Sequence, residues 1–291
     1  MHTWEDPDTA LGRISTELER LELGESVAEL DAYGLTVVPP ARVAPSDLVD
    51  GMLERVLDLM ERRNGARPEL ASGATHTNVF FPTLYYFLFE DPIFQEWLLN
   101  PVMRALVDYL LGEQCILHAT TVFMKGPTAP PEPGLQLGLH SDQQMVPAPF
   151  PPYALIAGAT LLLTDYTKEN GAFAFVPGSH RAGRHPVGGE GADRVVAVDA
   201  PKGSLLVHHG ALWHGSFGRT VPGLRVGMAY AYSRVFVTPL EAYREHVTKE
   251  MLDRHPRRFA QLLGQHVPTG STEEGPDLDK VYHAVVRTPW D

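Results

Sequence analysis

The sequence predicts a mainly β core, built as a sandwich or barrel and flanked by helices, which places the chain in the α+β or mainly β class. Two observations carry this prediction. Between about residues 114 and 235, short runs rich in β-branched and aromatic residues alternate with Gly, Pro and Asn. Before and after this stretch, apolar residues instead recur at spacings of three and four, which is typical of amphipathic helices.

The N-terminal part of the chain reads as mainly helical. Its apolar spacing predicts one amphipathic stretch over residues 14–30 and another over 46–60. Between them, residues 34–38, followed by two prolines, predict a short strand. A further helix is expected between residues 91 and 111, with a break at Pro101.

The central part should contain about eight short strands, at a spacing that favours an antiparallel sandwich or barrel over βαβ units. We expect them at 116–124, 135–141, 154–164, 172–176, 195–198, 204–208, 213–217 and 225–232. Helical pattern follows from Pro239 to Leu263, with an interruption at Pro256. We expect a single domain over residues 1–291, divided into a helical region (1–112), the β core (113–236) and a C-terminal helix and tail (237–291).

Bulk composition excludes several classes of partner. Hydrophobic residues make up 44% and charged residues 21% of the chain, which is ordinary globular usage. The formal net charge of −12 disfavours nucleic acid and anionic membranes as partners. Cys115 is the single cysteine, which fits a reducing compartment. The N-terminus shows no signal-peptide pattern, and no apolar run approaches the roughly 20 residues of a membrane span. We expect a cytoplasmic protein that acts on a small molecule.

One pair of residues suggests a metal site. His140 and Asp142 are two residues apart on a predicted strand, where alternate side chains share a face. His214, in a later β-type run, would complete a set of two histidines and one carboxylate. That set leaves three metal positions open, as in the Fe(II) oxygenases whose bidentate cosubstrate and O₂ occupy them. A His-x-Asp pair alone is more often a surface turn or a core histidine, so the prediction needs further support.

Arg225 supplies part of that support. It begins the last predicted strand, among apolar neighbours, where a guanidinium is costly unless an anion pairs with it. The planar guanidinium matches a carboxylate bidentately, and so suits the far carboxylate of 2-oxoglutarate. The alternative is an arginine on the surface of an edge strand.

A third motif lies between these two. Residues 170–180 read NGAFAFVPGSH and combine a turn, an alternating strand and a second turn. Together with HSD at 140–142 and WHGS followed by Arg225, this segment resembles the phytanoyl-CoA dioxygenase family over about residues 34–235. The motifs occur in the order and at the spacing of that family.

The resemblance implies a double-stranded β-helix core, of the jelly-roll or cupin-like type, with flanking N-terminal and C-terminal helices. It also implies Fe(II), 2-oxoglutarate and O₂ as cofactors. The matching positions place the metal on His140, Asp142 and His214, and the far carboxylate of 2-oxoglutarate on Arg225.

Two further residues are implied as contacts of the cosubstrate. Ser216 matches a position that assists Arg225, and Gln136, four residues before His140, is expected on the same strand face. The sequence departs from many relatives at Arg219, where an Asn is common. Asp142 is retained, whereas halogenating relatives replace this carboxylate with a small residue, so the resemblance favours a hydroxylase-type enzyme.

Other conspicuous side chains are expected to be structural. His180 should fix a turn, and His208 and His209, of which only one can face inward, should be core or surface histidines. An aromatic cluster is expected in the core, a role that overlaps with lining an apolar substrate site. Its members are Phe80, Phe81, Tyr85, Tyr86, Phe87 and Phe89.

The sequence thus predicts a dioxygenase that hydroxylates an unactivated C–H bond of a small apolar or amphipathic metabolite and releases succinate and CO₂. A cupin-like metal-dependent protein that does not use 2-oxoglutarate, such as an isomerase or a metal-binding module, is one alternative, and a silent binding protein is another. Arg225 argues against the first and the intact ligand set against the second. Nucleotide-binding, hydrolase and zinc-protease motifs are missing from the sequence.

Overall fold

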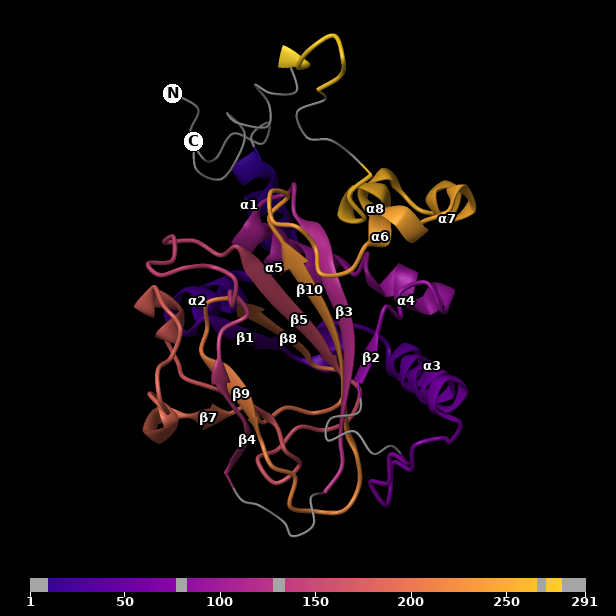
Figure 1. Cartoon of the computed structure of the whole chain (residues 1–291), viewed down its shortest axis with the longest axis vertical. Coiled ribbons are helices and arrows are strands. Elements are labelled where there is room, and N and C mark those ends of the chain that lie inside the picture. Colours follow the sequence, from indigo (N-terminus) through magenta and orange to yellow (C-terminus); the bar gives the residue numbers. More distant parts are fainter. Residues whose placement is uncertain (1–9, 77–82, 128–133, 266–270, 279–291) are drawn as a thin grey trace.

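A computed structural model describes residues 10–76, 83–127, 134–265 and 271–278. Two antiparallel sheets lie face to face, and helices cover the outer side of the larger sheet (Figure 1). This arrangement confirms the predicted fold class, a jelly-roll core with flanking helices.

The larger sheet has six strands in the order β1-β8-β5-β10-β3-β2, and the smaller has four in the order β4-β9-β6-β7. The strands are β1 (Leu35–Val38), β2 (Thr83–Tyr85), β3 (Ile116–Lys125), β4 (Leu135–His140), β5 (Ile156–Leu162), β6 (Phe173–Phe175), β7 (Val196–Ala197), β8 (Leu205–His209), β9 (His214–Phe217) and β10 (Arg225–Ser233). All eight strands predicted for the central part are present, within a few residues of their expected bounds.

Strand β10, near the middle of the larger sheet, shows how the two faces differ. Val226, Met228 and Tyr230 point outward into the main hydrophobic core that the helices complete. The alternate residues face the smaller sheet, and among them Ala229 and Ala231 are only half-buried although strands flank β10 on both sides. Small side chains on this inner face therefore leave space between the two sheets.

The helices pack mainly on the outer face. Helix α5 lies against β5 and β8, and α3 and α4 lie beside β2 (Figure 1). Within the described residues, no helix has both the length and the apolar character that crossing a membrane requires. The helices are α1 (Ala10–Arg20), α2 (Gly24–Tyr33), α3 (Ser46–Asn64), α4 (Pro92–Trp97), α5 (Pro101–Leu111), α6 (Tyr243–His246), α7 (Lys249–Arg254) and α8 (Arg257–Leu262).

Two local predictions were incomplete. The stretch 14–30 forms two helices, because Glu22 adopts a left-handed conformation (φ 54°) and the Leu23 amide donates to the Leu18 carbonyl, which ends α1. A residue other than Gly or Asn in that conformation gives little signal in a sequence. Strand β2 was missed, because three residues within an aromatic run pair with β3 only through tertiary contact.

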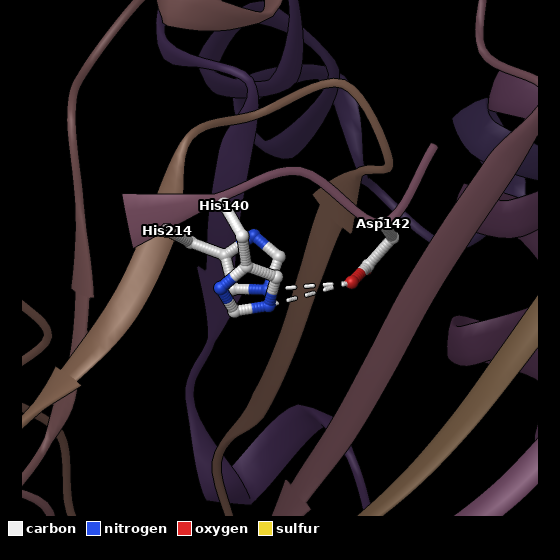
Figure 2. Close-up of side chains that lie close together, drawn as sticks. All are labelled: His140, Asp142 and His214. Carbon is white, nitrogen blue, oxygen red and sulfur yellow. Dashed lines mark ion pairs between the residues drawn. The ribbon is translucent and has the colours of Figure 1, made fainter. Parts of the chain in front are cut away.

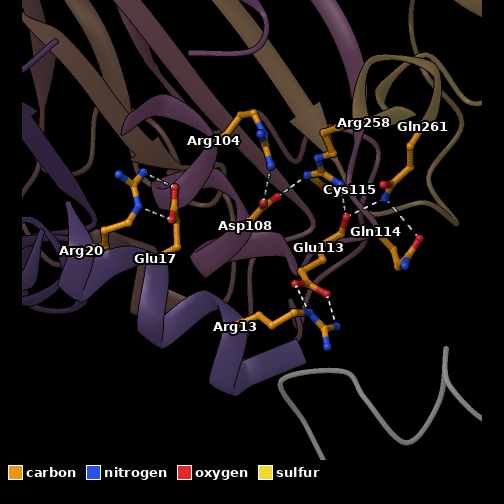
Figure 3. A network of polar contacts seen from close by, with 10 residues as sticks. All are labelled: Arg13, Glu17, Arg20, Arg104, Asp108, Glu113, Gln114, Cys115, Arg258 and Gln261. Atoms are coloured by element: carbon orange, nitrogen blue, oxygen red, sulfur yellow. Dashed lines mark hydrogen bonds and ion pairs between the residues drawn. The ribbon is translucent and has the colours of Figure 1, made fainter. Parts of the chain in front are cut away.

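A polar network fastens the C-terminal helices to the rest of the molecule (Figure 3). Arg258 of α8 forms a salt bridge with Asp108 of α5, and both side chains are largely buried. Arg258 also donates to the carbonyl of Glu113, whose own carboxylate pairs with Arg13 of α1. One guanidinium thus ties α8 to α5 and to the turn before β3. Burial raises the pKa of Asp108, which the charges of Arg258 and Arg104 oppose.

Replacing Arg258 by Met should lower the free energy of unfolding by about 3 kcal/mol, because it leaves the buried Asp108 carboxylate without its close partner. Urea unfolding of the purified protein measures the change. Arg20→Met is the matched control, because the Arg20–Glu17 pair lies on the surface and should contribute nothing measurable. Equal stability of the two variants would contradict a structural role for the Arg258 pair.

Candidate metal centre

Three side chains converge between the sheets at one end of the smaller sheet. His140 ends β4, His214 begins β9, and the two residues are paired directly across the ladder. Asp142 lies just beyond β4, where its amide donates to the carbonyl of Gly210. One potential ligand atom from each of the three residues lies within 4.8 Å of the others (Figure 2). The structure therefore brings together the three residues that the sequence singled out.

Both imidazoles are oriented for binding through the same nitrogen. The Nδ1 atom of His140 lies 3.1 Å from the Gly138 carbonyl oxygen, and that of His214 lies 3.0 Å from the Leu212 carbonyl oxygen. A carbonyl oxygen can only accept, so each contact fixes the proton on Nδ1 and leaves the Nε2 lone pair free. The two Nε2 atoms lie 4.0 and 3.5 Å from an Asp142 carboxylate oxygen.

The protonation states also suit a cation. Burial lowers the pKa of His214 to about 3, so its imidazole is neutral at physiological pH. For Asp142, burial favours the neutral acid, but the surrounding histidines outweigh it and hold the pKa well below its usual range. Carboxylates bind metals as anions and imidazoles bind them in the neutral form, so Asp142 and His214 have the protonation states that a metal requires.

A fourth residue, which sequence reasoning treated as core or surface, belongs to this centre. His208 of β8 faces inward, and its Nε2 lies 2.9 Å from the second Asp142 carboxylate oxygen. Its ring lies over Gly158 of β5, where a Cβ atom would overlap the imidazole. Gly158 is the residue directly paired with His208, so a bare backbone at this point lets the ring reach Asp142. His209 points away and contacts His180 instead.

The sequence motifs around His214 act through close packing. The Trp213 amide donates to the Ser179 hydroxyl (2.8 Å), so the VPGSH turn anchors the start of β9. This agrees with the structural role expected for that turn. At Gly215, a Cβ atom would overlap the Leu137 carbonyl, so the glycine lets β4 and β9 approach each other. Phe173 stacks on the His214 ring at 4.9 Å and fixes its plane.

A cationic region lies between the sheets beyond His214. Lys125 of β3 and Arg225 of β10 are paired across the ladder, and both are buried. The Lys125 ammonium group donates to the Ser216 hydroxyl and to the Phe217 carbonyl, each at 2.6 Å. Gly171 of the Asn-Gly turn packs on the Lys125 side chain, where a Cβ atom would overlap it. Ser216 thus lies beside this region, as the sequence predicts, whereas Lys125 was missed because it reads as an ordinary strand residue.

Arg225 is held from one side by an aromatic ring. Its guanidinium lies 4.8 Å from the centre of the Tyr166 ring, and within the described residues its Nε has no hydrogen-bond partner and no carboxylate pairs with it. Buried cationic groups without a nearby anion carry a substantial desolvation cost. An anionic ligand at this point would offset that cost.

The remaining predicted residues have mixed outcomes. Gln136 lies at an irregularity of β4, where the register shifts, so simple alternation with His140 does not apply; its Oε1 is buried without a partner among the described residues. Arg219 donates to the carbonyls of Asn170, Val221 and Pro222 and so shapes its own loop.

The aromatic cluster divides between two environments. Phe87 is fully buried in the outer core, as expected. Tyr85 is 54% exposed on edge strand β2, paired with Thr121. Phe80 and Phe81 lie outside the described residues.

The family model described as phytanoyl-CoA dioxygenase (PhyH) matches residues 30–227, which is more than half of the chain. The chain belongs to the phytanoyl-CoA dioxygenase family. Membership confirms the resemblance drawn from the motifs, places the chain among the dioxygenases, and agrees with the expected Fe(II), 2-oxoglutarate and O₂.

Two relatives show how the family similarity is distributed. An uncharacterised protein of Mycobacterium tuberculosis is 29% identical over 175 residues, which are 60% of this chain and 63% of the relative. The chain therefore spans less than two thirds of that protein. Dioxygenase af480 of Aspergillus fumigatus is 28% identical over 273 residues, which are 90% of this chain and 84% of the relative.

Solved structures share the fold at low sequence identity. HygX from Streptomyces hygroscopicus, solved with nickel and 2-oxoglutarate bound, superposes with a TM-score of 0.58 at 19% identity, covering 75% of this chain and 89% of HygX. SnoN, described as a non-haem α-ketoglutarate-dependent epimerase from nogalamycin biosynthesis, gives 0.56 at 22% identity, covering 77% of this chain and 86% of SnoN. At this identity the likeness establishes the double-stranded β-helix fold alone.

Replacing Gly158 by Ala should displace the His208 ring from Asp142 and lower metal affinity about 10- to 100-fold, because outer contacts orient metal-binding carboxylates. Titration of the metal-free protein with Fe(II) under anaerobic conditions measures the affinity. Gly24→Ala is the matched control, since no atom lies near the added methyl group. Unchanged affinity in Gly158→Ala would show that the His208 contact does not orient Asp142.

Binding of 2-oxoglutarate at neutral pH should take up a proton. Burial, with the nearby charge of Arg225, lowers the pKa of Lys125 to about 6, so Lys125 is mainly neutral at pH 7. A bound carboxylate would raise that pKa, so protons are taken up between the two pKa values and none are taken up well below pH 6. Calorimetry in buffers of different ionisation enthalpy measures the uptake, and Lys125→Met should abolish it.

Proposed function

We propose that this protein is an Fe(II)- and 2-oxoglutarate-dependent dioxygenase that hydroxylates an unactivated C–H bond of a small apolar or amphipathic metabolite, with release of succinate and CO₂. The observation that carries the proposal is the convergence of His140, Asp142 and His214 in metal-binding orientation next to a buried cationic region. The family supplies the reaction class. The hydroxylation outcome and the substrate go beyond it.

The residues present fit an iron(II) ion. Two Nε2 lone pairs and one carboxylate oxygen face a common point, and two histidines with one carboxylate are the donor set that would hold Fe(II) in a non-haem oxygenase. We assign His140, Asp142 and His214 as its ligands. When bound, Fe(II) with 2-oxoglutarate and O₂ supplies an oxidant strong enough to break a C–H bond.

The protein's own contribution is orientation. The far carboxylate of 2-oxoglutarate would accept hydrogen bonds from Arg225, Lys125 and Ser216, which lie together beyond His214. Arg225 offers a planar pair of donors and Lys125 a compact charge, so two donor geometries converge on one anion. Gln136, with a buried Oε1, is a weaker candidate for contact with the cosubstrate or the substrate. Tyr166 stacks on Arg225 and keeps its guanidinium in place.

The centre is shielded from bulk water in part. His214 and Ser216 are buried, whereas the side chains of His140 and Asp142 are each 29% exposed, on the side from which a substrate would approach. A water-poor environment strengthens the charge interactions at the cationic region and protects a reactive oxidant from side reactions. As part of the proposal, the single, buried Cys115 supports a reducing, cytoplasmic location.

Purified protein given Fe(II), ascorbate, O₂ and 2-oxoglutarate should form succinate, and a metabolite extract should increase the rate. Asp142→Ala and His214→Ala should lose metal binding and reduce succinate formation at least 100-fold, because each removes an assigned ligand. Arg225→Ala should instead raise the 2-oxoglutarate concentration required by about 10- to 100-fold, with iron still bound.

His246→Ala, on the exposed face of α6, is the control for these substitutions and should behave as wild type. Tight iron binding without any succinate would contradict the proposed reaction and favour a cupin-like metal protein that does not use 2-oxoglutarate. Activity of Asp142→Ala at the wild-type level would contradict the ligand assignment.

A further inference from the structure

Strand β3 contains a bulge at His118, a residue that has no role in the proposed function. Ala119 pairs with Ala231 of β10, and Leu117 pairs with the next residue, Tyr232, so His118 has no partner across the ladder. Leu117 belongs to the outer core, whereas Ala119 shares the inner face with Lys125 by alternation. Because of this extra residue, odd-numbered residues of β3 face the inner space after the bulge, whereas odd-numbered Leu117 before it faces the outer core.

The bulge is held in place from outside the sheet. The His118 carbonyl accepts hydrogen bonds from the amides of Leu240 and Glu241, at 2.9 and 3.1 Å. The buried Glu241 carboxylate in turn accepts from the amide and the hydroxyl of Thr120, both at 3.0 Å. These contacts satisfy the backbone groups that the irregularity takes out of the ladder. The Glu241 carboxylate also accepts from the Tyr86 amide (2.8 Å) and from the Tyr243 hydroxyl, so one buried group joins the bulge to the segment after β2 and to α6.

The side chain of His118 is buried and unsatisfied. It is 6% exposed, its Nδ1 is fully buried, and neither ring nitrogen has a hydrogen-bond partner among the described residues. Burial lowers the pKa of His118, while the negative charge of Asp142 acts in the opposite direction, which places the ring within range of the metal centre. An orphaned polar group of this kind is unfavourable and calls for a partner that is bound at another time.

His118 and the cationic region lie at opposite ends of the inner face. Lys125 and His118 are separated by seven residues of one strand, a distance of about 20 Å. Asp142 lies near the His118 end, because it bonds His208, and His208 belongs to the same cross-strand row as Gly158, Ala231 and Ala119. A ligand held at the cationic region and the metal would extend away from His118. A partner for the ring would therefore have to come from a different molecule, such as the primary substrate.

Apolar surface lies beside His118 on the inner face. Ala119 follows His118 on β3 and pairs with Ala231 of β10, and Ala229 lies two residues before Ala231. All three alanines share the inner face and are only half-buried, so their methyl groups are accessible from the space between the sheets. Accessible apolar groups on an inner surface are typical of a binding site for an apolar ligand.

We propose, on the basis of the proposed function, that His118 is a specificity-determining residue. It forms a hydrogen bond with one neutral oxygen, a hydroxyl or a carbonyl, of a primary substrate whose apolar body packs on Ala119, Ala229 and Ala231. The substrate class is thus a mono-oxygenated apolar skeleton. A neutral imidazole can donate to a carbonyl, and can either donate to or accept from a hydroxyl.

The test uses wild-type protein loaded with Fe(II) and 2-oxoglutarate without O₂, with loading verified by absorption before any probe is added. Calorimetry then compares linear and cyclic monoalcohols and ketones, each with the hydrocarbon of the same skeleton. The wild type should prefer the oxygenated member of a pair by about tenfold. His118→Leu should bind the hydrocarbons as before and lose the preference, and His118→Gln should retain part of it.

Each other outcome overturns the assignment. Equal affinity of the wild type for both members of every pair, or no binding of any probe, would exclude the proposed substrate class. Loss of hydrocarbon and alcohol binding together in His118→Leu would assign the ring a structural role. Failure of the wild type to load metal and 2-oxoglutarate would contradict the proposed function itself, and it is observed at the loading step.

Stability supplies a second measurement that needs no ligand. His118→Leu removes an unsatisfied buried group, so the ligand-free variant should unfold at the same temperature as wild type or a higher one. His246→Leu, an exposed histidine, is the matched control and should show no change. A clear fall in the unfolding temperature of His118→Leu alone would show that the ring supports the bulge and would overturn its role in binding.

Discussion

The structure depends on one negative charge between the sheets, the carboxylate of Asp142, whose side chain is 29% exposed. A carboxylate that is largely removed from water is costly unless charges or donors surround it, and here three imidazoles do so, from β4, β8 and β9. Strands of both sheets must therefore meet at this residue, which fixes how the sheets face each other. Glycine is required where the approach is closest, at Gly158 under the His208 ring and at Gly215 beside β4. In this arrangement the Nε2 atoms of His140 and His214 also point toward the carboxylate, so the three groups can bind one cation together.

The interior contains two neighbouring basic side chains, although the chain as a whole is acidic. The chain is acidic overall, at −12, yet Lys125 and Arg225 lie buried next to each other. Burial of the Arg225 guanidinium carries a desolvation cost, and burial together with that charge lowers the pKa of the neighbouring Lys125 to about 6. In the proposed function, a dicarboxylate that reaches from the metal to this region would offset the cost, so that affinity for the cosubstrate would come from a cost already present in the fold. Electrostatic selection of this kind acts locally, so a surface that repels large polyanions can coexist with a strong internal anion site.

The sequence predicted the strands and the ligand set because both are encoded locally. Each strand has its own alternating run, and the motifs around His140 and His214 have defined neighbours along the chain. Lys125 and His208 were not identified, because their roles depend on long-range register. Nothing near His208 in sequence indicates that Gly158 lies beneath its ring, and that pairing arises only when β5 and β8 align. Strand β2 was missed for the same reason, since it exists only through its pairing with β3.

The C-terminal segments outside the two sheets hold one end of β3 in place. The chain after β10 folds back so that Leu240 and Glu241 hold the bulge of β3, and α8 is fixed by Arg258 to α5 and to the turn before β3. Both attachments act on the end of β3 that carries His118. In the proposed function the sheets hold the metal centre, whereas a segment outside them holds His118, the residue that we assign to the substrate. On that assignment, changes in the C-terminal segment would alter what the protein binds while the metal ligands stay in place, which would separate the evolution of specificity from that of the oxidative chemistry.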